Sequence, residues 1–158
     1  FMKEKILEAF RDLGFKLEEE EGMGYCFNYE GLNLLYMYNE NDEEFLNIAL
    51  PGIVEVEEDR MLQICALLEK INSTLKYVKT YMLGNSVWLF YERELFGEED
   101  LMTVISRMIL HLEAGLVFAR KAMAEIEETM ANDSSADDTA ESAEEIVAEE
   151  IADDEDNE

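Results

Sequence analysis

The residues that could carry nucleophilic or metal chemistry are two cysteines, Cys26 and Cys65, and a single histidine, His111. A catalytic Cys–His pair needs a third group that orients the base, and it needs an open pocket. A zinc site built from these residue types uses closely spaced ligand pairs such as C-x-x-C or H-x-x-x-H, and the sequence has neither. We therefore interpret His111, which lies between Leu110 and Leu112, as a structural residue, and we predict no metal and no cofactor.

Carboxylates are the next candidates, because they can bind calcium or act as general acids and bases. Residues 39–44 are rich in oxygen ligands, yet they lack the central glycine and the final glutamate of a calcium loop. The pairs Glu57-Glu58 and Glu98-Glu99 are neighbours in sequence, and neighbours on a helix point apart. The four carboxylates at 18–21 are typical of a solvated loop. The sequence contains no catalytic constellation, so we predict that the protein is not an enzyme.

The tyrosines have the most unusual placement in the sequence. All seven fall in predicted strands, at Tyr25, Tyr29, Tyr36, Tyr38, Tyr77, Tyr81 and Tyr91. One interpretation is ordinary strand composition, since tyrosine favours strands. The other is a binding or dimer surface on the sheet, because an apolar ring with a polar tip suits a surface that is only sometimes covered. The candidates for that surface are Tyr36, Tyr38, Tyr77, Tyr81, Trp88 and Phe90.

The charge of the chain restricts its partners. Its 158 residues include 39 acidic and 12 basic ones, which gives a formal net charge of −27. A surface this acidic repels phosphate backbones and anionic membranes, so we expect no nucleic-acid partner and no membrane partner. A basic or amphipathic protein segment would suit this charge.

The cysteines and the hydropathy pattern favour a cytoplasmic protein. Two cysteines inside apolar patterns are too few for a disulfide framework, so we expect two buried thiols in a reducing compartment. No apolar run reaches the roughly 18 residues of a membrane span, and no secretory signal opens the sequence. We expect a cytoplasmic domain without a membrane segment.

A β-hairpin is predicted at residues 76–93, and the other elements are arranged around it. Two β-rich runs flank Gly84-Asn85, a two-residue turn signal. Each face of the hairpin is at least half apolar, so both faces need cover. Upstream strands are predicted at 23–29, 32–38 and 45–50, the last ended by Pro51-Gly52. The short loops between them indicate an antiparallel meander.

Apolar residues at spacings of three and four predict helices at 2–13, 57–72 and 98–130. The last helix would be roughly 45–50 Å long, more than a core of this size needs, so its C-terminal half is expected to project or to pair with another chain. The prediction is an α+β domain at 1–130, in which helices pack on an antiparallel five-stranded sheet in the order α-β-β-β-α-β-β-α. An acidic low-complexity tail at 131–158, which has no basic residue, is predicted to be disordered.

This order of elements resembles the YbjN-like family, which is similar to the type III secretion chaperone fold. The resemblance covers roughly residues 1–125. It includes Leu13-Gly14-Phe15 after the first helix and Leu67-Leu68-Glu69-Lys70-Ile71-Asn72 at the end of the second, whereas Leu75 stands at the family's second asparagine position. The resemblance implies a chaperone-like fold; type III chaperones are small acidic dimers that hold extended partner segments against apolar patches. YbjN-like proteins are loosely described as bacterial regulators, and neither group brings catalytic residues with it.

The sequence leaves two hypotheses about function. The first is a non-enzymatic module, chaperone-like or regulatory, that binds a protein or peptide and acts as a homodimer. The alternative is a small-molecule-binding domain or a minor enzyme with a pocket between sheet and helices. A concave pocket with perturbed titratable residues would distinguish the alternative.

Overall fold

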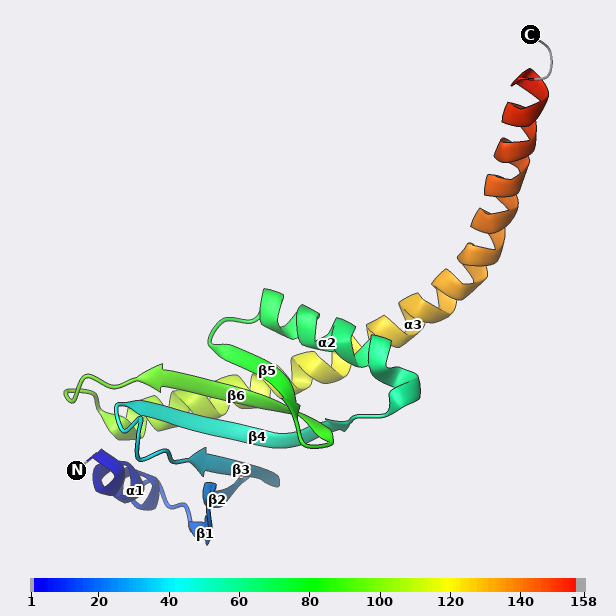
Figure 1. Ribbon diagram of the computed structural model, residues 1–158. Coiled ribbons are helices and arrows are strands. Elements are labelled where there is room, and N and C mark those ends of the chain that lie inside the picture. Colours follow the sequence, from blue (N-terminus) through cyan, green and yellow to red (C-terminus); the bar gives the residue numbers. More distant parts are fainter. Residues whose placement is uncertain (1, 156–158) are drawn as a thin grey trace. The chain divides into compact units, whose positions relative to one another are not determined.

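A six-stranded antiparallel sheet organises the first part of the chain (Figure 1). The computed structural model describes residues 2–133 in full and residues 134–155 by their backbone alone. Within the last helix the chain divides into two compact units, residues 1–122 and residues 123–158. The elements are α1 (Met2–Asp12), β1 (Glu18–Glu20), β2 (Gly24–Tyr29), β3 (Leu32–Met37), β4 (Phe45–Glu55), the 3-10 turn η1 (Glu58–Arg60), α2 (Met61–Thr74), β5 (Val78–Leu83), β6 (Ser86–Glu94) and α3 (Leu101–Glu155).

The α+β class and the antiparallel sheet are confirmed, and the strand order is β1-β2-β3-β4-β6-β5. The sheet has six strands rather than five, because the predicted acidic loop contains β1. Glu18 pairs with Cys26 and Glu20 pairs with Gly24, while the β1 side chains are exposed. This strand is defined by backbone pairing alone, so no apolar alternation marks it in the sequence.

The predicted hairpin is confirmed: β5 and β6 are joined at Gly84-Asn85, and Leu83 pairs with Ser86. Gly84 has a φ of +63°, as the first central residue of a type II′ turn requires. The predicted end of the third upstream strand at Pro51-Gly52 is wrong, because β4 continues to Glu55. The register of β4 against β6 shifts between Leu50 and Val54, and such an irregularity is one of the places where a strand can hold proline.

The helices α1 and α3 cover the same face of the sheet. One row of paired residues crosses the strands β3, β4, β6 and β5, and it consists of Tyr36, Ile48, Tyr91 and Val78. At one end of this row the ring of Phe10, from α1, lies 5.5 Å from the ring of Tyr36. At the other end α3 is in close contact, since a Cβ added to its Gly115 would lie 3.5 Å from a methyl group of Val78. We call this helix-covered side the inner face.

The second helix lies beside the edge strand β5. The side chain of Asn72 donates a hydrogen bond to the carbonyl oxygen of Thr80 at 3.0 Å, and it accepts one from the Thr80 N–H at 2.8 Å. An asparagine side chain thus takes the position that a further strand would occupy at this point of the edge.

The composition of α3 bears on the expectation that the chain has no membrane segment. Residues Leu101–Asp133 form a helical stretch that is long and apolar enough to cross a membrane by length and composition alone. The core helix of a globular domain can pass the same test. Within the first unit, one side of α3 is buried against the sheet through Ile105, Met108 and Leu112.

Residues 134–158 of the predicted tail lie outside the fully described residues, so its disorder stays a prediction.

The close pairing of β2 with β3 requires glycine at position 24. Gly24 has a φ of +149°, and a Cβ there would overlap the backbone carbonyl oxygen of Tyr36. Gly24→Ala is expected to lower the free energy of unfolding by more than ~3 kcal/mol, because strain and steric overlap add. Gly22→Ala is the control, since its φ is also positive but the space around it is open; it should cost ~1 kcal/mol. Chemical denaturation followed by Trp88 fluorescence measures both, and equal losses would contradict the prediction.

Candidate functional site

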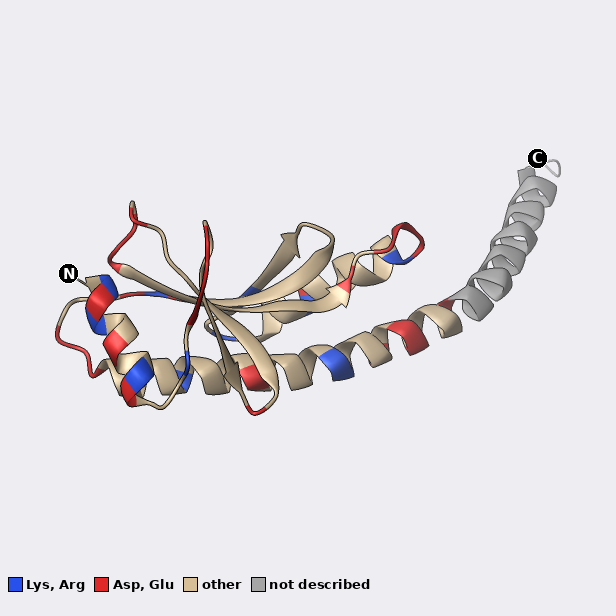
Figure 2. Ribbon diagram, turned by 90° about the horizontal axis from the view of Figure 1, so that it is seen from below, with Lys and Arg blue, Asp and Glu red and all other residues tan. Residues whose placement is uncertain are grey.

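The side of the sheet away from α1 and α3, the outer face, carries the most distinctive side chains. Successive strand residues point to opposite faces, so the neighbours of the inner row point outward. These neighbours form a second paired row, Gly24 to Met37 to Asn47 to Glu92. In Figure 2 the first part of α3 runs along one side of the sheet.

An aromatic cluster, formed by Tyr81, Trp88 and Phe90, occupies the β5–β6 part of the outer face. The ring of Tyr81 stacks on the ring of Phe90 with centroids 4.1 Å apart, and Trp88 lies 5.9 Å from Phe90. Leu35, Ala49 and Phe90 are buried, and the side chains that pack around them also come from strands, namely Cys26, Met37, Leu83 and Trp88. The cluster therefore shields its own base without a covering helix, and the Tyr81 side chain remains 42% exposed.

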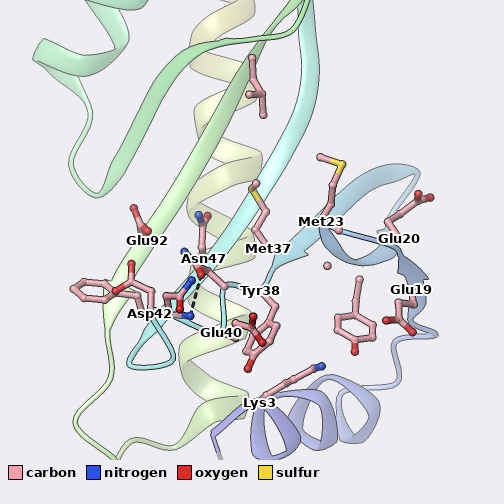
Figure 3. A pocket seen from close by; sticks show the side chains of 17 residues that line it. Lys3, Glu19, Glu20, Met23, Met37, Tyr38, Glu40, Asp42, Asn47 and Glu92 are labelled. Atoms are coloured by element: carbon pink, nitrogen blue, oxygen red, sulfur yellow. Dashed lines mark hydrogen bonds between the residues drawn. The ribbon is translucent and has the colours of Figure 1, made fainter.

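An open cleft of about 680 Å³ adjoins this cluster, and we call it the acidic cleft (Figure 3). Its floor is the row Gly24, Met37, Asn47 and Glu92, and its rim carries Glu19, Glu20, Glu40 and Asp42, with Lys3 as the basic residue of the lining. In Figure 3 the carboxylates lie on both sides of Met37 and Asn47. Met37 and Leu83 belong to both features, because they line the cleft and pack against the base of the aromatic cluster.

The α1 end of the cleft is occupied by a cation held over aromatic rings. Lys3 Nζ lies 4.5 Å from the ring centre of Tyr38 and 5.5 Å from that of Tyr25. A hydrogen bond with Tyr25 raises the pKa of Lys3. The Tyr38 hydroxyl donates to Glu43 Oε1 at 2.8 Å, which raises the pKa of Tyr38. The positive charge of Lys3 thus already interacts with the tyrosine side chains of the protein.

Asn47 contributes an unsatisfied acceptor to the floor. Among the described residues, its Oδ1 is a buried side-chain oxygen that accepts no hydrogen bond. Leaving such an acceptor unpaired costs on the order of 1–3 kcal/mol of folding free energy. This cost would be recovered if a bound group donated a hydrogen bond to Asn47.

The structure brings three of the six predicted surface residues together, Tyr81, Trp88 and Phe90. Tyr38 lines the acidic cleft. Tyr36 corrects the prediction, because it is 1% exposed and packs under α1 in the core, so it cannot contact a partner there. Tyr77 is exposed, but its ring stacks on Tyr91 of the inner row. These residues therefore do not form one surface.

Cysteine and histidine do not combine into a nucleophilic site. Cys26 is half-buried on the outer face, whereas His111 of α3 contacts Tyr91 on the inner face. Burial raises the pKa of the Cys26 thiol, and the carboxylate of Glu20 raises it further, so the thiol is poorly nucleophilic at neutral pH. The expectation of two buried cysteines is wrong for Cys65, which is exposed on the surface of α2.

A second, smaller cavity of about 280 Å³ lies between sheet and helices. Its lining is Leu13, Phe15, Tyr29, Ser106, Ile109 and Leu110. This lining offers two hydroxyl groups and no carboxylate, imidazole or thiol. Within the described residues, no three histidine, cysteine, aspartate or glutamate side chains are grouped so that they could hold a metal ion.

Sequence reasoning missed Asn47 and the cleft. The alternation of Leu46, Ile48 and Leu50 did mark Asn47 as pointing away from a core. What it could not supply was the row of strand partners that places Asn47 beside Met37 and Glu92.

Replacing Asn47 by leucine is expected to stabilise the fold. The change removes the unpaired buried oxygen at similar side-chain size, and we expect a gain of ~1 kcal/mol in the free energy of unfolding. Asn33→Leu is the control on the same face, because Asn33 Oδ1 accepts a hydrogen bond from Asn28 at 3.2 Å; this variant should gain nothing. Thermal unfolding of both variants measures the difference, and a loss of stability in Asn47→Leu would contradict the prediction.

Two comparisons of the sequence with known proteins gave no match: neither a protein-family model nor a curated protein is similar to this chain. Comparison of the structure did find similar folds. One is the crystal structure of YbjN from E. coli, described as a "putative transcription regulator", with a TM-score of 0.58 and 14% identity over 75% of this chain and 91% of that one.

A second similar structure is an uncharacterized protein from Methanothermobacter thermautotrophicus. Its TM-score is 0.53, with 17% identity over 82% of this chain and 99% of that one. Identities this low compare folds and not activities. The resemblance inferred from the order of elements is thereby confirmed at the level of architecture: the chain has a YbjN-like fold.

Proposed function

We propose that this protein is a non-enzymatic module, chaperone-like or regulatory, that binds an extended protein or peptide segment on its outer face. The observation that carries the proposal is the aromatic cluster, which is stacked in place and partly exposed without a helix above it. Tyrosine and tryptophan bring large contact areas at low entropic cost, so they recur at protein interfaces. The acidic cleft continues this surface through Met37 and Leu83.

Regulation through a protein partner fits the charge of the chain better than regulation through DNA. YbjN is described as a putative transcription regulator. Direct contact with DNA relies on basic side chains that neutralise phosphates, whereas this chain has a net charge of −27. A cytoplasmic protein or peptide partner that is basic or amphipathic would be attracted by the same charge.

The alternative function, binding of a small molecule, has one feature in its favour, the cavity between sheet and helices. Its volume of about 280 Å³ is at the lower limit of the usual range for ligand pockets. Its lining has Tyr29 and Ser106 as polar groups, which would suit a small apolar molecule with one hydroxyl or carbonyl group.

Selection of peptides from a random display library with the full chain as bait tests the proposed function. We expect enriched peptides whose affinity falls at least about tenfold in Tyr81→Ala, because this variant removes the ring that stacks on Phe90. Tyr77→Ala is the matched control, since Tyr77 is also exposed and stacked but lies on the inner side. No enriched peptide, or equal losses in both variants, would overturn the proposal.

The homodimer is part of the same proposal and is supported by α3. Leu110 and Val117 are 53% and 63% exposed and lie seven positions apart in the sequence, so they are on one side of the helix. Arg120 and Lys121 follow them, and residues 101–122 contain three basic residues and one acidic residue. In a chain of strong negative charge, this stretch is where two copies would repel each other least.

We expect the full chain to be a dimer in light scattering, and Val117→Glu to be a monomer. A carboxylate at the centre of an apolar helix–helix contact must be desolvated without a partner, which is unfavourable. Leu62→Glu is the control, because Leu62 is a 71% exposed apolar residue on a different helix, α2. A monomeric wild type, or a dimer that Val117→Glu leaves intact, would contradict the α3 contact.

A further inference from the structure

The acidic cleft has more negative charge than the protein itself neutralises. Five carboxylates line it, from Glu19, Glu20, Glu40, Asp42 and Glu92. Glu92 forms an ion pair with Lys79 at 2.6 Å, and Lys3 is engaged with tyrosine rings at the α1 end. Of the other four, Glu19 acts on Lys3, whereas Glu20, Glu40 and Asp42 remain on the rim. Their combined field favours a cation in the space between them.

The floor of the cleft contains an unpaired hydrogen-bond acceptor. Asn47 Oδ1 is buried and unpaired within the described part of the chain. Lysine and arginine side chains carry only donors at their charged ends, so either could donate to Asn47 Oδ1 while remaining close to the rim carboxylates. Apolar side chains at the edge of the same cleft, Met23 and Phe45, are 38% and 37% exposed and suit the aliphatic stem of such a residue.

We infer that the acidic cleft binds a lysine or arginine side chain of the partner segment, while the aromatic cluster binds an apolar side chain beside it. This inference rests on the proposed function and specifies its partner. Along β4, Asn47 of the cleft and Ala49 at the base of the cluster are two residues apart and point to the same face. An extended segment has the same two-residue repeat, so its basic residue and an apolar residue would be separated by one position.

Two other possible occupants are disfavoured by their charge. The C-terminal residues 131–158 contain acidic and no basic side chains, so the rim carboxylates would repel them. A second copy of the chain would bring a further net charge of −27 to an already acidic surface. A basic segment of another protein remains the occupant that the charge of the cleft favours.

The test uses the display library with the full chain and then measures Kd for one enriched peptide by Trp88 fluorescence. Trp88 is the one tryptophan of the sequence and belongs to the aromatic cluster, so the signal reports on the site. The enriched peptides should contain lysine or arginine two positions away from an apolar residue, with one residue between them. A matched peptide in which glutamine replaces each basic residue should bind at least about tenfold more weakly, and the difference should shrink at high salt.

Variants of the rim separate local from general charge effects. Glu40→Gln combined with Asp42→Asn should weaken the basic peptide about tenfold and leave the glutamine peptide unchanged. The control is Glu57→Gln combined with Glu58→Gln, which removes the same charge before and within η1, away from the cleft lining. Asn47→Leu should also weaken the basic peptide although the variant remains folded.

The outcomes distinguish the inference from the proposed function. Enriched peptides without basic residues, whose binding still depends on Tyr81, would overturn the inference and support the proposed function. Equal weakening by the rim variant and the η1 control would show that net charge alone acts, which also overturns the inference. A library that yields no enriched peptide would overturn both.

Discussion

The pairing of β4 with β6 inside the sheet is the constraint on which the remaining structure depends. It joins segments that are about forty residues apart and sets Ile48 opposite Tyr91 and Ala49 opposite Phe90. Because strand residues alternate, this one register decides both surfaces of the sheet. The first pair belongs to the core under the helices, and the second belongs to the base of the aromatic cluster. A shift of β6 by one residue against β4 would turn the β6 side chains to the opposite faces and would place Glu92 in the core.

The apolar side chains on the two faces of the sheet are buried in different ways. On the inner face, α1 and α3 cover the apolar row, and Gly115 allows α3 to approach Val78 closely. On the outer face, the large side chains of neighbouring strands cover one another, with Tyr81 stacked on Phe90. Stacking of this kind buries the base of the cluster but leaves the side of the cluster that faces away from the sheet partly exposed to solvent. Such a surface can be covered by a partner without any rearrangement of the core, and the proposed function depends on this property.

Much of the architecture could be predicted from the sequence, because it depends on local patterns. The turn at Gly84-Asn85, the three helices and the strands with apolar alternation all have local signals. The strand β1 could not be predicted, since three glutamates form it through backbone pairing only. The surface was predicted in part: Tyr81, Trp88 and Phe90 do lie together, whereas Tyr36 is in the core. Tyr36 points to the inner face and the other three point to the outer face. Which face a strand residue points to depends on its strand partners and on the side that the helices cover.

The side chain of Asn72 has a consequence for how this protein behaves at high concentration. Open strand edges can pair with the edges of other chains, and this pairing is the first step of fibrillar aggregation. At β5 the outward N–H and C=O groups of Thr80 are already bonded to Asn72, so an incoming strand finds neither group free. At the opposite edge, β1 presents three glutamates, which would repel an identical strand from a second molecule. One edge of the sheet is thus protected by hydrogen bonding and the other by charge, so neither edge favours pairing with a second molecule.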